Sequence, residues 1–199
     1  MSNTLFSPLQ MGSVTLPNRV LMAPLTRMRA APGDVPTPLM TEYYRQRASA
    51  GLIVTEAAQV SPQGKGYMQT PGIYSAEQTA GWQQVTQAVH EAGGRIAIQL
   101  WHVGRISHSS LQPDGQEPVS ASNLPARTKT TVLGADGRPE RVNCSVPRGL
   151  RIDEMPTLIE TYVQATKNAR EAGFDLVEIH AAHGYLLHQF LSPISNQRS

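Results

Sequence analysis

Residues 175–185 read Asp-Leu-Val-Glu-Ile-His-Ala-Ala-His-Gly-Tyr and decide the fold of this chain. Their first part, Asp175 to Ile179, is a short apolar run of the kind that forms a buried strand. Two imidazoles, His180 and His183, follow directly, and then the phenol of Tyr185. In α/β proteins the binding and catalytic groups gather just past the carboxyl ends of the strands. We therefore expect a strand end that carries part of a functional site.

The residues alone leave the chemistry of the two histidines open. They could bind a metal, donate hydrogen bonds to a substrate oxygen, or be structural side chains whose hydrogen bonds are satisfied within the protein. Tyr185 favours hydrogen-bond donation over a metal, because a phenol can give up a proton and is an uncommon zinc ligand. We expect no metal in this stretch.

Three further apolar runs precede this strand, at residues 19–25, 52–55 and 96–101. They alternate with helical segments, which predicts a parallel α/β sheet with right-handed crossovers. No Gly-x-Gly-x-x-Gly follows the first strand, so a dinucleotide-binding open sheet lacks its main signature. A barrel instead gathers all strand ends around one mouth, and we predict a (β/α)8 TIM barrel to which this chain supplies about the first four strands. Polar residues end each of the four strands: Thr26, Glu56 to Gln59, Gln99 with Trp101, and His180 with His183.

The connecting segments carry helix start signals. Thr37 and Pro38 are an N-cap and first residue for a helix that runs to about residue 49. Ser75 with Gln78 forms a capping box before a second helix, which ends at two glycines. Asp153 is expected to cap a third helix with one buried apolar stripe. That stripe consists of Met155, Leu158, Ile159, Tyr162, Thr166 and Ala169.

Two segments lack a strong helix or strand period. Residues 5–18 predict a small turn or hairpin before the main fold. Residues 104–150 are rich in Gly, Pro, Ser and Asn and predict a long loop or lid, which in proteins of this kind usually carries function.

Composition limits the partners and the compartment. The formal net charge of the 199 residues is +2, with scattered basic residues, so we expect no nucleic-acid partner. The start of the chain lacks the signal-peptide pattern, and no window approaches 18 consecutive apolar residues, so we expect no membrane span. The single cysteine, Cys144, fits a reducing compartment, and we predict a cytoplasmic protein.

Four motifs occur in a fixed order along the chain. They are Pro17-Asn18-Arg19-Val20 through Ala23 to Arg27; Tyr43 to Ala48; Gln99 to His102 with Gly104-Arg105; and His180 to Leu186 with Gln189 to Pro193. With them the chain resembles the old yellow enzyme family of FMN-dependent ene-reductases, and within it the bacterial N-ethylmaleimide and pentaerythritol tetranitrate reductases. The resemblance implies that residues 1–199 are the N-terminal half of a single FMN-binding TIM-barrel domain.

The resemblance implies a set of flavin contacts at the strand ends. Thr26 would hydrogen-bond the flavin carbonyl next to the reactive nitrogen and favour charge on the reduced ring. Gln99 would hold the pyrimidine edge of the ring, because its amide both donates and accepts. His180 would lie at the cofactor as well as at the substrate. Backbone contacts to the same ring are expected from Pro24, Leu25 and Ala58.

The resemblance also implies the substrate side of the reaction. His180 and His183 would bind the oxygen of an activated alkene, such as an enone, maleimide or nitro compound, where negative charge builds up. Tyr185 would protonate the α-carbon after hydride reaches the β-carbon, and its ordinary pKa of about 10 suits that role. Tyr67 and Trp101 are expected as pocket walls. The resemblance favours NADPH as the reductant, with NADH as the alternative.

The length of the chain leaves alternatives. An eightfold barrel takes about 250 residues, and the loops after strands seven and eight, which normally hold a phosphate, are not among these 199. One alternative is therefore a non-catalytic half-barrel fragment that pairs with another half. A weaker one is a metal-dependent barrel hydrolase that uses His180 and His183. The residues do not indicate an oligomeric state or a physiological substrate.

Overall fold

The computed structural model describes residues 4–198, and its centre is a four-stranded sheet. The strand order is β10 (Leu176–Ile179), β5 (Ile96–Trp101), β4 (Leu52–Gln59) and β3 (Leu21–Met22), and all neighbouring strands are parallel. The four predicted strands are thus confirmed, although β3 is shorter than its apolar run and β4 is longer. Parallel pairing brings the carboxyl ends of all four strands to the same edge of the sheet.

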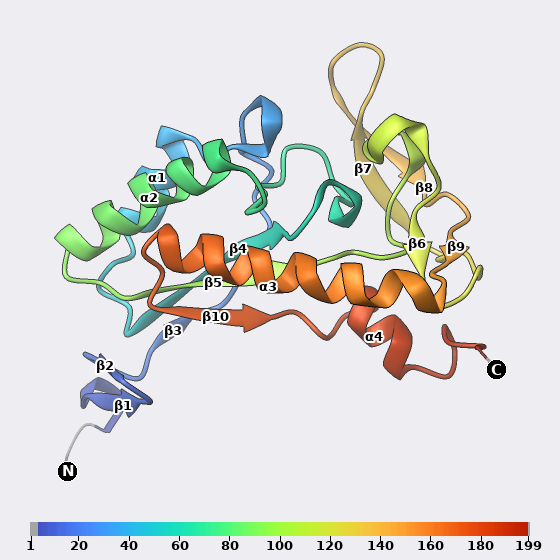
Figure 1. Cartoon of the computed structure of the whole chain (residues 1–199). Helices are drawn as coiled ribbons and strands as arrows, with labels where there is room; N and C mark the ends of the chain where they lie inside the picture. The colour runs from blue at the N-terminus through green and yellow to red at the C-terminus, as the bar shows by residue number, and fades with distance from the viewer. Residues whose placement is uncertain (1–3, 199) are drawn as a thin grey trace.

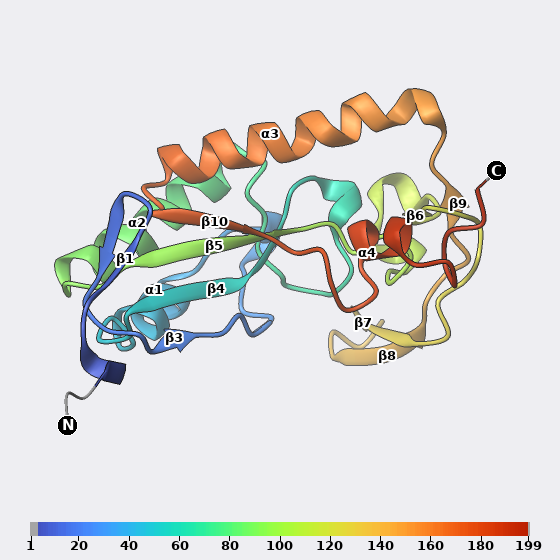
Figure 2. The same cartoon turned by 90° about the horizontal axis from the view of Figure 1, so that it is seen from below.

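Helices cover one face of the sheet, and the view from below looks onto the other face (Figures 1 and 2). They are α1 (Pro38–Arg45), α2 (Ala76–Glu91) and α3 (Met155–Glu171), each lying between two strands in the chain order. The predicted N-terminal hairpin is confirmed as β1 (Leu9–Met11) and β2 (Val14–Leu16), which pair antiparallel. The hairpin lies where the sheet strands begin, at the end opposite the predicted site.

Helix starts follow the predicted caps in two of three cases. The Thr37 hydroxyl caps α1, which ends at Arg45 and so is shorter than predicted. The capping box of α2 is confirmed, with the Gln78 amide N–H donating to Ser75 Oγ over 3.2 Å. The predicted cap at Asp153 is wrong. A 3-10 turn, Ile152–Glu154, precedes α3, and Glu154 occupies the N-cap position, although its side chain accepts no capping hydrogen bond from the first turn of the helix.

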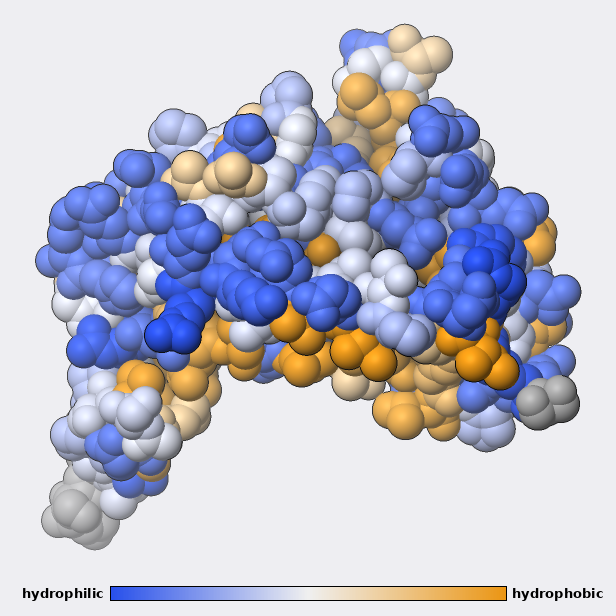
Figure 3. Space-filling model, viewed as in Figure 1, coloured by the Kyte–Doolittle hydropathy of each residue, from blue (hydrophilic) through white to orange (hydrophobic). Residues whose placement is uncertain are grey.

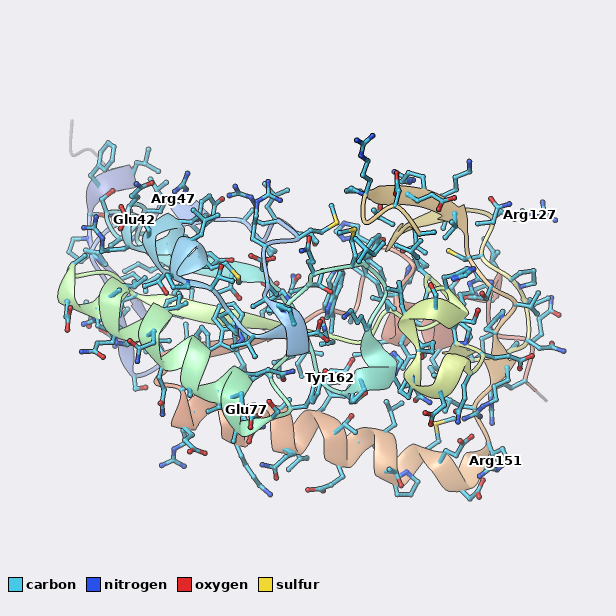
Figure 4. The ribbon with its side chains drawn as sticks, turned by 90° about the horizontal axis from the view of Figure 1, so that it is seen from above. Glu42, Arg47, Glu77, Arg127, Arg151 and Tyr162 are labelled. Carbon is cyan, nitrogen blue, oxygen red and sulfur yellow. The ribbon has the colours of Figure 1, made fainter. Side chains whose placement is uncertain are left out.

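The core lies between the sheet and its helices. Trp82 of α2 is fully buried, and its ring lies 6.2 Å from that of Tyr44 and 5.4 Å from that of Phe174. Its indole N–H donates to the Gly72 carbonyl over 2.9 Å, which satisfies the one polar atom of the side chain. Tyr162 of α3 points toward the sheet and packs against this core (Figure 4). Burial of each such ring contributes about 1.5–3 kcal/mol.

The long segment 104–150 is more ordered than predicted. It contains an antiparallel hairpin, β7 (Lys129–Leu133) and β8 (Pro139–Asn143), which projects beyond the strand ends (Figure 1). A short parallel pair, β6 (Val119–Ser120) and β9 (Arg148–Gly149), closes the base of the segment. The prediction of an irregular loop is therefore wrong for these residues, since Thr and Val in β7 and Val in β8 pair across the hairpin.

A fourth helix and several single turns complete the structure. Helix α4 (Leu186–Leu191) follows the predicted site and packs near β6. The 3-10 turns are Thr4–Phe6, Pro32–Asp34, Pro62–Gly64, Ser109–Leu111, Pro113–Gly115 and Ile152–Glu154.

Both edges of the central sheet are open. On β10, Val177 is 41% exposed and Ile179 is 55% exposed, so the prediction that this strand is buried is wrong. On the opposite edge, Leu21 is 45% exposed, and Leu25 just beyond β3 is 62% exposed. Figure 3 shows an apolar band along the lower side of the molecule, the side on which β10 and α4 lie. Each edge strand has a neighbour on one side only, which explains the exposure.

The apolar stripe of α3 is only partly buried. Ile159 is 63% exposed and Thr166 faces solvent, so the predicted stripe is wrong at these two positions. Ala165, Asn168 and Ala169 are buried instead. The Asn168 amide donates to the Ile73 carbonyl over 2.8 Å, which satisfies a polar group on the buried face. The helix is thus rotated slightly from the predicted orientation.

None of the helices within residues 4–198 combines the length and the hydrophobicity needed to cross a bilayer. The first three residues, on which the absence of a signal-peptide pattern partly rests, lie outside the described range.

The capping box of α2 provides a stability test. Ser75→Ala removes the oxygen that accepts from Gln78, and the free energy of unfolding should fall by about 1 kcal/mol. Ser61→Ala is the matched control, because Ser61 precedes a 3-10 turn without a side-chain cap bond. Urea denaturation of the two variants measures the difference. Equal effects of both substitutions would contradict the assigned role of the box.

Candidate functional site

The end of β10 carries a cluster of aromatic rings. The His180 amide donates to the Leu100 carbonyl over 2.9 Å, which extends the parallel ladder by one residue and fixes the position of the imidazole. The ring of Trp101 stacks on that of His180, with centroids 6.2 Å apart and an interplanar angle of 19°. Tyr185 meets both rings edge-on, each at 4.9 Å. The sequence-predicted donors and pocket wall therefore lie together.

A tight turn brings His183 and Tyr185 back over His180. The Tyr185 amide donates to the Ala182 carbonyl over 3.2 Å, and the two residues between them have positive φ, 55° at His183 and 81° at Gly184. Glycine suits such a conformation, whereas a histidine adopts it at a cost of about 1 kcal/mol or more. The turn places the His183 ring 5.3 Å from that of His180. The two imidazoles thus point into one region.

The hydrogen bonds of His180 assign its tautomer. The Ala182 amide donates to His180 Nδ1 over 3.3 Å, so Nδ1 is the acceptor and Nε2 carries the proton of the neutral ring. Burial lowers the pKa of His180 below its ordinary value, and the neighbouring His183 adds to that shift. The imidazole is therefore a neutral N–H donor at physiological pH, which suits an oxygen that gains negative charge.

Tyr185 is held as a protonated phenol. Its hydroxyl lies 3.1 Å from that of Tyr67, and the Tyr67 ring stacks on Trp101 at 5.9 Å. Burial raises the pKa of Tyr185 well above its ordinary value, and the hydrogen bond with Tyr67 raises it further. The phenol consequently keeps its proton at neutral pH and can deliver it to a bound molecule.

A buried amide that the sequence analysis gave no role supports the turn. Gln189 of α4 is 1% exposed, and its Nε2 donates to the carbonyls of Gly184 at 2.6 Å and Val103 at 3.0 Å. Its Oε1 accepts from the Arg105 amide at 3.2 Å and from Ser120 Oγ at 2.9 Å. Gln189 therefore ties the His-Tyr turn to the loop after β5. The signal in the sequence is a lone amide in an otherwise apolar stretch of a short helix.

Gly104 lets the loop after β5 approach Gln189 closely. Its φ is 62°, and a Cβ at this position would lie 2.1 Å from Gln189 Oε1. Any side chain here would collide with the amide, so this glycine is required by contact as well as by backbone conformation.

The predicted flavin contacts lie along the same sheet edge, on other strands. Gln99 pairs with Glu178 in the parallel register, and its Nε2 donates to Glu178 Oε1 over 2.5 Å. Ala58 pairs with Leu100 and is fully buried. The sequence analysis gave no role to Glu178, a charged residue within the otherwise apolar run of β10.

Three further predicted contacts follow β3, two strands away from β5. The Thr26 hydroxyl is half-buried and makes no hydrogen bond within residues 4–198, so it can serve a bound group. Pro24 is half-buried, and Leu25 lines an open cavity of about 570 Å³ between β3 and α1. Among the described residues, no hydrogen bond or aromatic ring contact joins Pro24, Leu25 or Thr26 to the His-Tyr cluster. The two groups share an edge of the sheet.

A metal centre would need further ligands near the histidines. Within the part of the chain that the structure describes, no three His, Cys, Asp or Glu side chains come together as a metal-binding group. The hydrolase alternative, which relied on His180 and His183, therefore gains no support from the geometry.

Comparison with known proteins points in one direction. Residues 4–199 match the model of the NADH:flavin oxidoreductase / NADH oxidase family. Rice (Oryza sativa subsp. japonica) 12-oxophytodienoate reductase 7 is 47% identical over 98% of this chain, and Arabidopsis thaliana 12-oxophytodienoate reductase 2 is 41% identical over 98%. The matches cover 49% and 51% of those two proteins. The chain thus spans about half the length of the curated relatives it matches.

Solved structures give the same picture. Morphinone reductase in complex with tetrahydroNAD matches 98% of this chain and 54% of its own, with a TM-score of 0.95 and 54% identity. The old yellow enzyme homologue from Zymomonas mobilis matches 98% of this chain and 53% of its own, with a TM-score of 0.92 and 46% identity. The predicted fold class is confirmed, since the parallel sheet and its helices are part of an old yellow enzyme TIM barrel.

The tautomer and charge of His180 can be measured by NMR. The imidazole should titrate with a midpoint below 6.5 and carry its neutral-form proton on Nε2. Trp101→Ala removes the ring that stacks on His180 and so exposes the imidazole to solvent. The titration midpoint should then rise, because burial is the main cause of the lowered pKa of His180. A midpoint above 6.5 in the unsubstituted protein, or a proton on Nδ1, would contradict the assignment. Because the folded pKa is lowered, this group's contribution to stability is present above pH 6.5 and lost as the pH falls through the folded pKa.

Proposed function

The chain belongs to the NADH:flavin oxidoreductase / NADH oxidase family, and on this premise we propose that it supplies the substrate-binding and proton-donating half of an FMN-dependent ene-reductase site. The observation that carries the proposal is the pairing of a neutral Nε2–H donor, His180, with a protonated phenol, Tyr185, around one space. Reduction of an activated alkene needs one group that stabilises charge on oxygen and another that protonates carbon.

The substrate oxygen would lie against the two imidazoles. His180 and His183 would donate to it and bind it more tightly as its charge grows, which is the requirement for catalysis. Tyr67 stacks on Trp101, which is only 1% exposed, so a flat molecule would pack on the half-buried Tyr67 ring, with Trp101 supporting that ring from behind. Tyr185 would pass its proton to the α-carbon of the alkene. The preferred substrate class is therefore a small activated alkene whose carbonyl or nitro oxygen reaches both histidines.

The strand ends suit an isoalloxazine ring. The Thr26 hydroxyl makes no hydrogen bond among the described residues, and the Gln99 amide is anchored by Glu178. The side chain of Ala58 is small and fully buried, so it would not obstruct a flat ring. When bound, FMN would supply the hydride. Thr26 would donate to a ring carbonyl and Gln99 would hold the pyrimidine edge, with Pro24 and Leu25 offering backbone contacts. Each of these assignments is part of the proposal.

The names of the relatives support the substrate class and the reductant. 12-Oxophytodienoate and morphinone are ketones by name, which fits an oxygen held by two imidazole donors. The complex of morphinone reductase with tetrahydroNAD supports a nicotinamide as electron source. We propose NADPH or NADH as reductant, in a cytoplasmic setting.

The open sheet edges favour a second candidate. Val177 and Ile179 on β10 and Leu21 on β3 would be covered in a closed barrel. The 199 residues alone would then be a non-catalytic half-barrel, active only when a complementary half covers these edges.

Half-reactions with reconstituted FMN test the proposal. In Tyr185→Phe, alkene-dependent reoxidation of the reduced flavin should slow by about 10²–10⁴-fold, while reduction by nicotinamide stays within about threefold. Tyr67→Phe is the control, because it removes a hydrogen bond to Tyr185 and leaves the acid in place. Stopped-flow absorbance follows both steps. Equal decreases in the rates of the two half-reactions would count against Tyr185 as the proton donor.

The substrate-oxygen role has a separate readout. His180→Ala combined with His183→Ala should weaken the binding of a phenolic ligand by about 10-fold or more, because two hydrogen bonds to a charged oxygen are lost. The flavin absorbance change on titration measures the affinity. Unchanged affinity would refute the donor pair. A chain that takes up no FMN at all would favour the half-barrel candidate.

A further inference from the structure

A buried carboxylate within β4 links three elements near the edge of the sheet that carries the site. Glu56 is 1% exposed, and its Oε2 accepts from the Arg27 amide over 3.1 Å. Its Oε1 accepts from the Tyr44 hydroxyl of α1 over 3.2 Å, and its own amide donates to the same hydroxyl over 2.8 Å. The carboxylate therefore joins the loop after β3, the strand β4 and the helix α1.

The loop that this carboxylate holds is strained. Met28 has a φ of 52°, a left-handed conformation that is costly for a residue with a side chain. The Arg29 guanidinium donates to the carbonyls of Arg27 and Met28, both at 3.1 Å, and the Arg27 guanidinium lies 3.9 Å from the centre of the Tyr43 ring. A strained turn persists only where surrounding contacts over-determine it. Glu56 is the residue of the sheet whose side chain accepts a hydrogen bond from the backbone of this turn, at the Arg27 amide.

Glu56 also lies at a bulge in β4. The register between β4 and β5 shifts between Val54 and Ala57, so Thr55 and Glu56 form the irregular step. Thr55 Oγ1 donates to the Glu56 carbonyl at 2.8 Å and accepts from the Gln99 amide at 3.4 Å, which partly replaces the lost ladder bond. Bulges often re-aim side chains next to active sites. The bulge here adjoins Gln99 on one side and the Thr26–Arg27 loop on the other.

We propose that Glu56 is a positioning residue for the flavin-binding edge, which sets the orientation of Thr26 by holding the next amide in the chain, that of Arg27. This inference rests on the proposed function, because it assumes that Thr26 faces the flavin. Glu56 itself touches neither substrate nor cofactor in this role.

The cost of the carboxylate supports a positioning role over simple packing. Burial raises the pKa of Glu56, so an ionised carboxylate here lowers stability relative to an exposed one. A small cavity of about 80 Å³ lies beside it, lined by Arg27, Arg29, Tyr43 and Glu56 among others, so the site is not filled for packing alone. The carboxylate instead accepts two directed hydrogen bonds, one from the Arg27 backbone amide and one from the Tyr44 hydroxyl.

Amide exchange in the flavin-free chain tests the link directly. In Glu56→Ala, exchange at the Arg27 amide should accelerate by about 10-fold or more relative to amides of the same global stability. Tyr44→Phe is the matched control, because it breaks the same buried network and leaves the Arg27 bond intact. Its Arg27 amide should stay within about threefold of the unsubstituted chain. Glu56→Gln, which keeps an oxygen acceptor, should recover part of the protection. Equal acceleration in Glu56→Ala and Tyr44→Phe, or none in either, overturns the proposal.

FMN titration then tests the consequence for the cofactor edge. Glu56→Ala should raise the Kd of FMN and shift the flavin absorption in the same direction as Thr26→Ala. In the double variant the Kd should stay within about twofold of Thr26→Ala alone, since Glu56 acts through Thr26. If the factors by which the two single substitutions raise the Kd multiply in the double variant, the proposal is overturned. If the unsubstituted chain binds no FMN, the proposed function fails for these residues, and the exchange rate of the Arg27 amide still decides whether Glu56 holds the loop.

Discussion

Parallel strand pairing is the constraint on which the rest of the structure depends. Because β3, β4, β5 and β10 run in one direction, the residues that follow them arrive at the same edge from four places in the sequence. The ladder of backbone hydrogen bonds continues one residue past β10, because the His180 amide donates to the Leu100 carbonyl. The strand pairing therefore fixes the backbone of the first residue of the candidate site. Without that alignment, the imidazoles, the Trp101 ring and the Gln99 amide would belong to separate surfaces. The sheet thus brings four strand ends, which are far apart in the sequence, to one edge of the molecule.

Much of this arrangement could be predicted from local patterns. Apolar runs located all four strands, the Ser75 box located a helix start, and the His-Tyr motif located the cluster of rings, because each signal lies within a few residues of its effect. The failures depend on distant partners. Asp153 resembles a cap but a 3-10 turn displaces the helix start, and β10 looks buried although it has one neighbour only. The β7–β8 hairpin shows no sustained hydrophobic periodicity in the sequence. Its two strands have only five residues each, and a turn separates them.

Supporting residues were the hardest to predict. Gln189 reaches backbone atoms 84 and 86 positions earlier in the chain, and Glu56 holds an amide 29 positions earlier. No spacing rule connects such pairs. The sequence placed Glu56 among the polar residues that follow the second strand, but nothing in the sequence pattern indicates its partner Arg27. The predicted contacts at Thr26, Pro24, Leu25, Ala58 and Gln99 stay predictions, with suitable positions along the sheet edge.

The contact between Gly104 and Gln189 has a consequence for sequence variation. With a virtual Cβ 2.1 Å from the amide oxygen, position 104 has no room for drift while residue 189 remains glutamine. A larger residue at 104 would expel the amide, release the carbonyl of Gly184 and free the turn that carries Tyr185. A residue without a side chain at position 104 thus leaves room for the Gln189 amide that supports the turn carrying Tyr185, 81 positions later in the chain (185 minus 104).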